Sequence, residues 1–281
     1  MTNRKLRTVG ATALVLGLVA LMLILILTAL HAVGTDANLY YRLQQDAWQT
    51  MDAASAAGIS DDDLRMLDGR LAAYLSGDGA ALNAPDADGA SGTSFPEIVP
   101  VEVSGEVRPA FNMKEMAHME DCFRLFELLR KVRRRLIPWA ILLAVGGAYL
   151  LQDRKKARLS AWLSPLVLLI PLGAFGIWAA ADFDGAFIFF HRLLFSNDLW
   201  LLNPRTDLLI RICPESMFMG MGLRIGIWSL AALIGVPALA TLITIIWPKN
   251  KQDEANKWND NRATRRASAQ KPRTFDFGEK R

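Results

Sequence analysis

The residues best suited to acid–base chemistry in this chain are its histidines, of which there are three. His118 lies in the stretch Glu115-Met116-Ala117-His118-Met119-Glu120-Asp121, with one carboxylate three residues before it and another three residues after it. Residues three apart share a face of a helix, so either Glu115 or Asp121 could orient the imidazole and support its protonated form. The alternative interpretation is a solvated helix face with mixed charges.

His191 has a more unusual setting, because it lies between Phe187-Ile188-Phe189-Phe190 and Arg192-Leu193-Leu194-Phe195. A connection as long as residues 182–222 is uncommon without a function of its own. We interpret it as a re-entrant or interfacial element that lines a lipid-facing cavity, and the alternative is a loop that only covers the helices. The candidates for supporting roles in this segment are Arg192, Asn197, Asp198, Trp200 and Asp207.

Either histidine could take part in general acid–base catalysis, since a side chain with a pKa of about 6.5 can accept and return a proton near neutral pH. Asn197, Arg192 or backbone amides could stabilise an oxyanion. The sequence has no His-Glu-x-x-His pair, no Gly-x-Ser-x-Gly elbow and no phosphate-binding glycine loop. We therefore predict no metal site and no cofactor. We interpret His31 as a residue of the membrane interface.

The elements that must position these residues are membrane spans. Hydrophobic residues make up 52% of the 281 residues and charged residues 21%, which is too apolar for an ordinary soluble protein. Four uncharged runs hold much of this excess: Val9–Leu30, Leu136–Gln152, Leu159–Ala181 and Ile225–Trp247. The first, third and fourth are long enough to cross a bilayer, whereas the second covers only about 25 Å. The basic residues before the first run also suit a signal peptide, but the run is too long for one and no clean cleavage site follows, so we predict a retained anchor.

The distribution of Lys and Arg predicts the orientation. The N-terminus, the loop 153–160 and the tail 248–281 are basic, whereas residues 31–135 and 182–222 carry more acidic than basic residues. We therefore expect both termini in the cytoplasm. The cluster Arg130, Lys131, Arg133, Arg134 and Arg135 disagrees with this orientation, but charge signals are weak in long translocated segments.

The expected fold is mainly α, a polytopic membrane protein with four transmembrane helices and a small extracytoplasmic α/β domain. Its expected parts are a basic flank with the first transmembrane helix (1–30), the extracytoplasmic domain (31–135), the second helix (136–152), a cytoplasmic loop (153–160), the third helix (161–181), the extracytoplasmic re-entrant or interfacial loop (182–222), the fourth helix (223–247) and a basic, disordered cytoplasmic tail (248–281).

Local patterns predict the contents of the extracytoplasmic domain. Residues 38–54 and 60–75 are expected to be helical, the second with Ser60 as its N-cap before three aspartates. Residues 77–93 are expected to form a mobile loop. Residues 98–103 and 107–111 are expected to form a hairpin. A helix from Met113 is expected to run into the second span and to supply the length that the span lacks.

Two further features concern partners. We expect the basic tail to lie on the anionic inner leaflet, and the alternative of nucleic-acid binding is the weaker one. Cys122 and Cys213 are expected to pack as free thiols, with a disulfide or a thioester at Cys122 as alternatives. The sequence leaves the oligomeric state open.

Two motifs carry a family resemblance. The first is Glu115-x-x-His118-Met119-x-Asp121 and the second is His191-x-x-x-Phe195-x-Asn197-Asp198-x-Trp200-x-x-x-Pro204-x-Thr206-Asp207-x-Leu209-Ile210-x-x-x-Pro214-Glu215. Together with the four-span layout they resemble the bacterial lipoprotein intramolecular transacylase family. The resemblance implies a bacterial cell membrane protein that moves an acyl chain from the glycerol of a diacylglyceryl-modified N-terminal cysteine to its α-amino group. It implies His118 and His191 as the catalytic pair, at the outer leaflet surface, and the lipoprotein N-terminus and membrane lipids as partners, without nucleic acid.

This chemistry suits the residues. An α-amino group has a pKa near 8 and must lose a proton to act as a nucleophile, which histidine can accept. Two rivals remain at this point. One is a non-enzymatic membrane protein that binds or chaperones lipoproteins or a membrane partner, and the other is a lipase-like hydrolase that releases the fatty acid.

Overall fold

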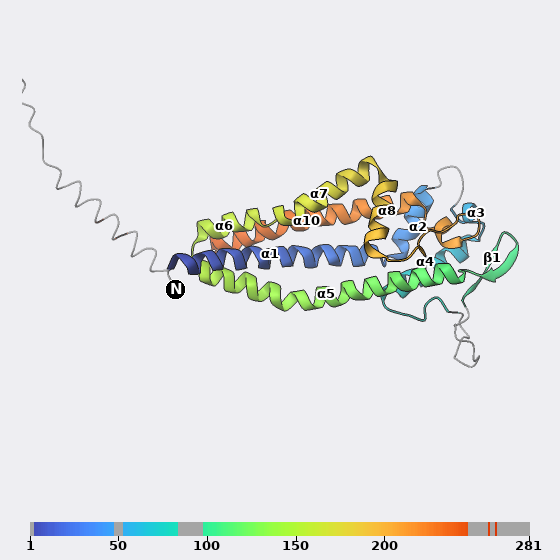
Figure 1. The fold of residues 1–281 in the computed structure, drawn as a ribbon, viewed down its shortest axis with the longest axis horizontal. Coiled ribbons are helices and arrows are strands. Elements are labelled where there is room, and N and C mark those ends of the chain that lie inside the picture. Colours follow the sequence, from blue (N-terminus) through green and yellow to red (C-terminus); the bar gives the residue numbers. More distant parts are fainter. Residues whose placement is uncertain (1–2, 48–52, 84–97, 247–257, 259–261, 263–281) are drawn as a thin grey trace, which may run out of the picture. The chain divides into compact units, whose positions relative to one another are not determined.

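The computed structural model describes residues 3–47, 53–83 and 98–246, together with Trp258 and Arg262. The chain divides into two compact units, residues 1–241 and 242–281. The first unit contains the candidate site and almost all of the described secondary structure (Figure 1). Its described part is mainly helical with one two-stranded sheet, which confirms the predicted class.

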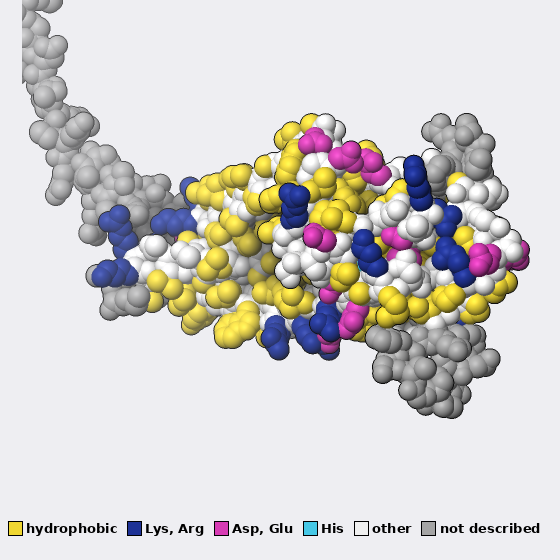
Figure 2. Space-filling model, turned by 45° about the vertical axis from the view of Figure 1, so that its right-hand side comes forward, with side chains coloured by type: hydrophobic (Ala, Val, Ile, Leu, Met, Phe, Trp, Pro, Cys, Tyr) yellow, Lys and Arg dark blue, Asp and Glu magenta, His cyan; other side chains and the backbone are white. Residues whose placement is uncertain are grey.

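Four helical segments are long and apolar enough to cross a membrane, as the sequence predicted. They are α1 (Asn3–Val33), α5 (Met113–Leu151), α6 and α7 together (Arg154–Leu163 and Leu166–Ala181), and α10 (Glu215–Ile246). Hydrophobic side chains cover these helices on the face shown in Figure 2, and many of them are exposed. An exposed apolar surface on this scale is stable against lipid rather than water.

The helices α1 and α5 pack closely because small residues let their backbones approach. A Cβ atom added at Gly17 would lie only 2.3 Å from the amide nitrogen of Ala144. On the other helix, a Cβ atom at Gly147 would lie 2.3 Å from the amide nitrogen of Leu14. Larger side chains would therefore push the two helices apart.

The structure extends or corrects several predicted boundaries. The helix that begins at Met113 does continue through the second span, as expected. The segment 153–160 is not an irregular loop, because Asp153 caps the helix α6 by accepting a hydrogen bond from the amide of Lys156. The segment 182–222 is also largely helical, and α10, which contains the predicted fourth span, begins at Glu215.

The segments that lie beyond the long helices form one unit, which we call the cap (residues 34–111 and 195–214, as far as described). It contains α2 (Ala37–Ala47), α3 (Ala53–Ala57), α4 (Asp61–Ser76), β1 (Pro100–Val103), β2 (Glu106–Pro109) and α9 (Leu208–Ile212). Its core is apolar and joins segments that are far apart in sequence, with Phe111, Leu64, Leu67, Leu82, Leu208 and Ile212 fully or almost fully buried. This core fixes α9 beside α3.

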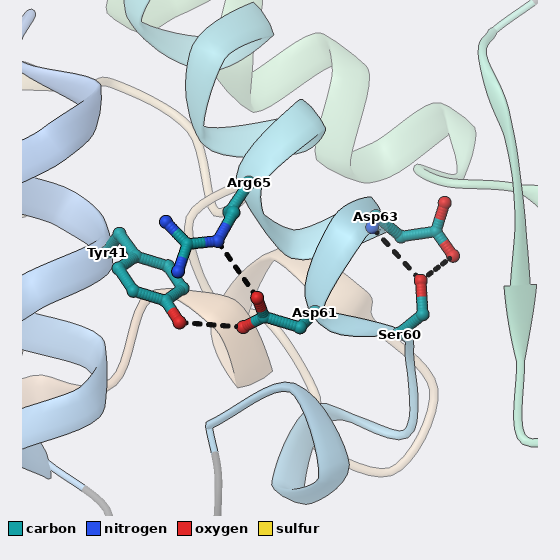
Figure 3. Close-up of polar contacts among 5 residues, drawn as sticks. All are labelled: Tyr41, Ser60, Asp61, Asp63 and Arg65. Atoms are coloured by element: carbon teal, nitrogen blue, oxygen red, sulfur yellow. Dashed lines mark hydrogen bonds and ion pairs between the residues drawn. The ribbon is translucent and has the colours of Figure 1, made fainter.

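The start of α4 forms as predicted. The Ser60 hydroxyl accepts a hydrogen bond from the amide of Asp63, and Asp61 binds both Tyr41 and Arg65 (Figure 3). Carboxylates in the first turn of a helix are favoured by the helix dipole. These contacts tie α4 to α2.

The predicted hairpin also forms, as the antiparallel strands β1 and β2. Ser104 and Gly105 make its turn, both with positive φ values of 54° and 90°. Two positive φ values match the right-handed twist of a hairpin, which explains the Ser-Gly pair.

Other predictions are tested only in part. The helix expected over residues 38–54 is helical as α2 and α3, and residues 48–52 between them lie outside the described residues. Most of the loop predicted over residues 77–93 and nearly all of the tail also lie outside them. Cys122 and Cys213 are free thiols, as expected.

Candidate active site

His118 lies in the second turn of α5, where that helix leaves the cap core. Its ring is buried, and its Nε2 atom is 3.7 Å from the Cys122 sulfur, one helical turn further on. Its Nδ1 atom is buried and has no hydrogen-bond partner in the described part of the chain. The edge of the ring meets Phe195, with ring centroids 5.3 Å apart.

His191 lies near the end of α8 (Phe183–Leu194), a helix that turns across the long helices (Figure 1). Its Nδ1 atom lies 2.8 Å from the carbonyl oxygen of Phe187. A carbonyl only accepts, so Nδ1 carries the proton and donates, which leaves the lone pair of the neutral ring on Nε2. The rings of Phe187 and Trp200 pack against the imidazole of His191, with centroids 4.0 Å and 5.0 Å from its centroid. Burial lowers the pKa of His191, although the hydrogen bond to Phe187 opposes this effect.

The two histidines come together in the fold. Their ring centroids are 6.1 Å apart with an angle of 39° between the rings. Phe195 lies beside both rings. Two imidazoles at this separation can reach neighbouring atoms of one bound substrate, so one can accept a proton while the other donates one.

Glu115 has a different role from the one that its spacing suggested. Its side chain is fully buried, and its two oxygens accept hydrogen bonds from the amides of Asn112, at 2.8 Å, and Leu209, at 2.6 Å. The first bond completes a capping box at the start of α5. Glu115 therefore does not orient His118, and it joins α5 to α9 instead.

Asp207 reinforces the same junction. Its Oδ1 atom accepts hydrogen bonds from the side-chain amide of Asn112, at 2.9 Å, and from the Thr206 hydroxyl, at 2.8 Å. Its Oδ2 atom accepts from the Asn203 backbone amide at 2.7 Å. These bonds lower the pKa of Asp207, although burial, the largest single influence, acts in the opposite direction. Two carboxylates thus fix the segment after α8 to the helix that carries His118.

Asp121 also contacts the other segment and does not hydrogen-bond to His118. It accepts a hydrogen bond of 2.8 Å from the side chain of Asn197, whose own oxygen accepts from the Leu199 amide. One proton of the Asn197 side-chain amide is therefore already donated to Asp121. Arg192 and Asp198 are exposed, and neither side chain makes a hydrogen bond within the described residues.

Several residues of the site were not selected from the sequence. Asn112 precedes Glu115 by three residues, which is the spacing of a capping box and could have identified it. Phe187 acts through its backbone carbonyl one turn before His191, a role that residue type does not reveal. Lys114 donates to the carbonyl of Leu201 and adds a third link between the two segments.

The other face of α8 is apolar and exposed. Ile188, Phe189, Phe190 and Leu193 project from it, whereas His191 and Ala186 are buried. Such an amphipathic helix suits a membrane interface, with its apolar face in the acyl chains. Among the described residues, no three His, Cys, Asp or Glu side chains gather as a metal site requires.

The fold and the site define an integral membrane protein in which a pair of buried histidines lies between membrane-spanning helices and an extramembrane cap. The model of the lipoprotein intramolecular transacylase Lit family matches residues 15–218. The chain belongs to this family, whose members are acyltransferases that act on lipoproteins.

Solved structures agree with this assignment in fold. The chain is similar to the membrane integral lipoprotein intramolecular transacylase Lit from Bacillus cereus, with a TM-score of 0.52 and 22% identity over 84% of this chain and 93% of that one. A mutant of the same enzyme gives a TM-score of 0.55 and 21% identity over 86% and 91% of the two chains. None of the curated proteins matches the chain.

Proposed function

We propose that this protein moves an acyl chain from the glycerol oxygen of a diacylglyceryl-modified lipoprotein to the α-amino group of the same N-terminal cysteine. The product is a lyso-form lipoprotein, and the reaction is an isomerisation in which no group is lost. The proposal rests on membership of the Lit family and above all on one observation, the pair of buried imidazoles 6.1 Å apart.

In the proposed reaction, the amine nitrogen attacks the ester carbonyl carbon. His191 accepts the amine proton at Nε2, since its Nδ1 proton is held by the carbonyl of Phe187. The C–N bond forms, and the C–O bond to glycerol breaks as the departing oxygen receives the proton that Nε2 of His191 took from the amine. His118, whose ring centroid lies 6.1 Å from that of His191, donates a hydrogen bond to this oxygen. The protein supplies no nucleophile, because donor and acceptor belong to one substrate.

Proximity is the main contribution of the site in this proposal. Holding the amine and the ester carbonyl of one substrate at reactive distance removes much of the entropic barrier. The aromatic rings around His191 keep water away from the reacting ester, which suppresses release of the fatty acid. General acid–base catalysis by the histidines adds roughly 10²- to 10⁴-fold to the rate.

We further propose that both termini lie in the cytoplasm of a bacterial cell and that the site faces the outer leaflet. The basic flanks Arg4–Arg7 and Arg154–Arg158 support this orientation by the positive-inside rule. The exposed apolar face of α8 supports a site at the level where the acyl chains of a lipid begin.

The proposal is tested in cells that lack other lipoprotein N-acylation. His118→Asn and His191→Asn are each expected to abolish N-acylated lyso-lipoprotein, measured by mass spectrometry of N-terminal lipopeptides. His31→Asn is the matched control, because His31 is the remaining histidine and packs against Phe126. N-acylation that persists in both site variants would refute histidine catalysis.

A further inference from the structure

A basic cluster lies on α5 between the cap and the uncharged part of the helix. Arg130, Lys131, Arg133, Arg134 and Arg135 follow a single acidic residue, Glu127, which pairs with Lys131 at 2.7 Å. Arg130 donates to the backbone carbonyl of Leu75. Arg134 and Arg135 are exposed and make no ion pair within the described residues. The cluster thus keeps a large positive charge.

The packing of α5 against α1 fixes the depth of this cluster. Gly10 lies against Leu151, and Gly34 lies against Phe126, so the two helices run antiparallel in a constant register. The same register places residues 133–135 level with residues 26–28 of α1. That level lies within the uncharged run 9–30 of α1. The arginines are therefore at or just below the membrane surface on the side of the cap.

Charged side chains at this depth need a partner. A guanidinium in hydrocarbon is costly unless it reaches water or an anion. Arginine also matches phosphate well, because its planar donor group can bind two phosphate oxygens at once. The phosphates of the membrane lie at this level.

An apolar stripe continues from the basic residues toward the membrane centre. Trp139, Leu142 and Val145 are 61%, 59% and 66% exposed. Trp139 is one turn below Arg135 and lies on the same helix face. On the face shown in Figure 2, basic side chains gather along the lower edge of the molecule, beside the hydrophobic surface of the long helices. The α5 surface is thus basic at one level and apolar nearer the membrane centre, which matches the phosphate headgroup and the acyl chains of a phospholipid.

We infer that this face of α5 is a binding site for an anionic phospholipid in the leaflet next to the cap. Arg134 and Arg135 bind its phosphate, and its acyl chains lie along Trp139 and Leu142. The charge of the cluster favours an anionic headgroup over a zwitterionic one. The lipid differs from the proposed substrate, because the diacylglyceryl group of a lipoprotein carries no phosphate. The inference does not depend on the proposed function.

The test uses the full-length protein and lipid retention, measured by native mass spectrometry. The probes are phosphatidylglycerol and phosphatidylcholine with identical acyl chains. Wild-type protein is expected to retain phosphatidylglycerol preferentially, and Arg134→Gln/Arg135→Gln is expected to lower its retention about 30-fold, since each basic residue contributes about fivefold near an anionic surface. Arg65→Gln/Arg124→Gln removes the same charge from α4 and from the start of α5, outside the basic cluster, and is the matched control.

Two results would overturn the inference. One is equal retention of the two lipids by the wild-type protein, and this result does not depend on whether any variant folds. The other is unchanged phosphatidylglycerol retention in Arg134→Gln/Arg135→Gln. If that variant does not fold, Arg134→Lys/Arg135→Lys keeps the charge and is expected to retain the preference for phosphatidylglycerol, and loss of the preference in a folded Lys variant counts against the site.

Discussion

Replacing Glu115 by Gln is expected to weaken the alignment of the two histidines without changing either of them. The carboxylate accepts one hydrogen bond at each oxygen, from the amides of Asn112 and Leu209. A carboxamide has a single accepting oxygen, so its NH₂ group faces the other amide. One buried backbone donor is then left unsatisfied.

The magnitude follows from these two bonds. A hydrogen bond to a charged group contributes about 1.5–3 kcal/mol, and an unsatisfied buried donor costs about 1–3 kcal/mol. Loss of one bond and weakening of the other give roughly 3 kcal/mol for the contact between α5 and α9. This value sets an upper limit of about 150-fold on the fall in kcat, and the pH profile is expected to stay unchanged because both histidines remain.

The assay combines turnover of a synthetic diacylglyceryl lipopeptide with thermal unfolding of the purified protein. Glu120→Gln is the matched control, since Glu120 lies on the same helix and makes only an exposed ion pair with Arg124, of the kind that contributes little. Wild-type turnover and stability in Glu115→Gln would refute the reasoning. An equal loss in Glu120→Gln would do the same.

Three further predictions concern single groups. Because burial lowers the pKa of His191, this base stays neutral at pH values below the usual pKa of a histidine, and the acidic limb of the kcat profile is expected below pH 6.5. Trp200→Ala exposes the ring, so a pH–rate profile of this variant is expected to show the acidic limb at a higher pH. Burial raises the pKa of Asp68 in α4 to about 7, so the folded state favours the protonated carboxyl. The free energy of unfolding is therefore expected to fall by up to about 4 kcal/mol as the pH rises from 4 to 7. Denaturant titration should find this loss in the wild-type protein and not in Asp68→Asn. Gly147→Ala is expected to lower the melting temperature through its contact with α1, whereas Gly146→Ala is not, since a Cβ atom there meets nothing within 4 Å.

The elements with local signals could be predicted from the sequence. Four uncharged runs predicted the membrane spans, the Ser60 cap and its aspartates predicted α4, and the Ser104-Gly105 pair lay at the turn of the hairpin. Each of these features depends on neighbours in the sequence. The local physics of hydrophobic runs, helix caps and turns was sufficient for them.

The arrangement of the site depends on contacts between distant segments, and the sequence predicted it less well. The spacing of Glu115 and His118 suggested a contact between them, but the amide of Leu209 binds that carboxylate from another segment. Asp121 is likewise bound by Asn197. The helix α8 was missed although its residues form an amphipathic pattern, because its long apolar run beside the membrane was interpreted as part of an interfacial loop. That both histidines belong to one site was implied only by the family resemblance.

The proposed function is tested most directly by the mass of the product. Purified protein in nanodiscs is incubated with a synthetic diacylglyceryl lipopeptide, and the lipopeptide is examined by tandem mass spectrometry. An intramolecular transfer predicts an unchanged intact mass, fragment ions with one acyl chain on the α-amino nitrogen, and no free fatty acid. A product lighter by one acyl chain, with free fatty acid, would show a hydrolase, and an unmodified lipopeptide would contradict the proposed activity altogether.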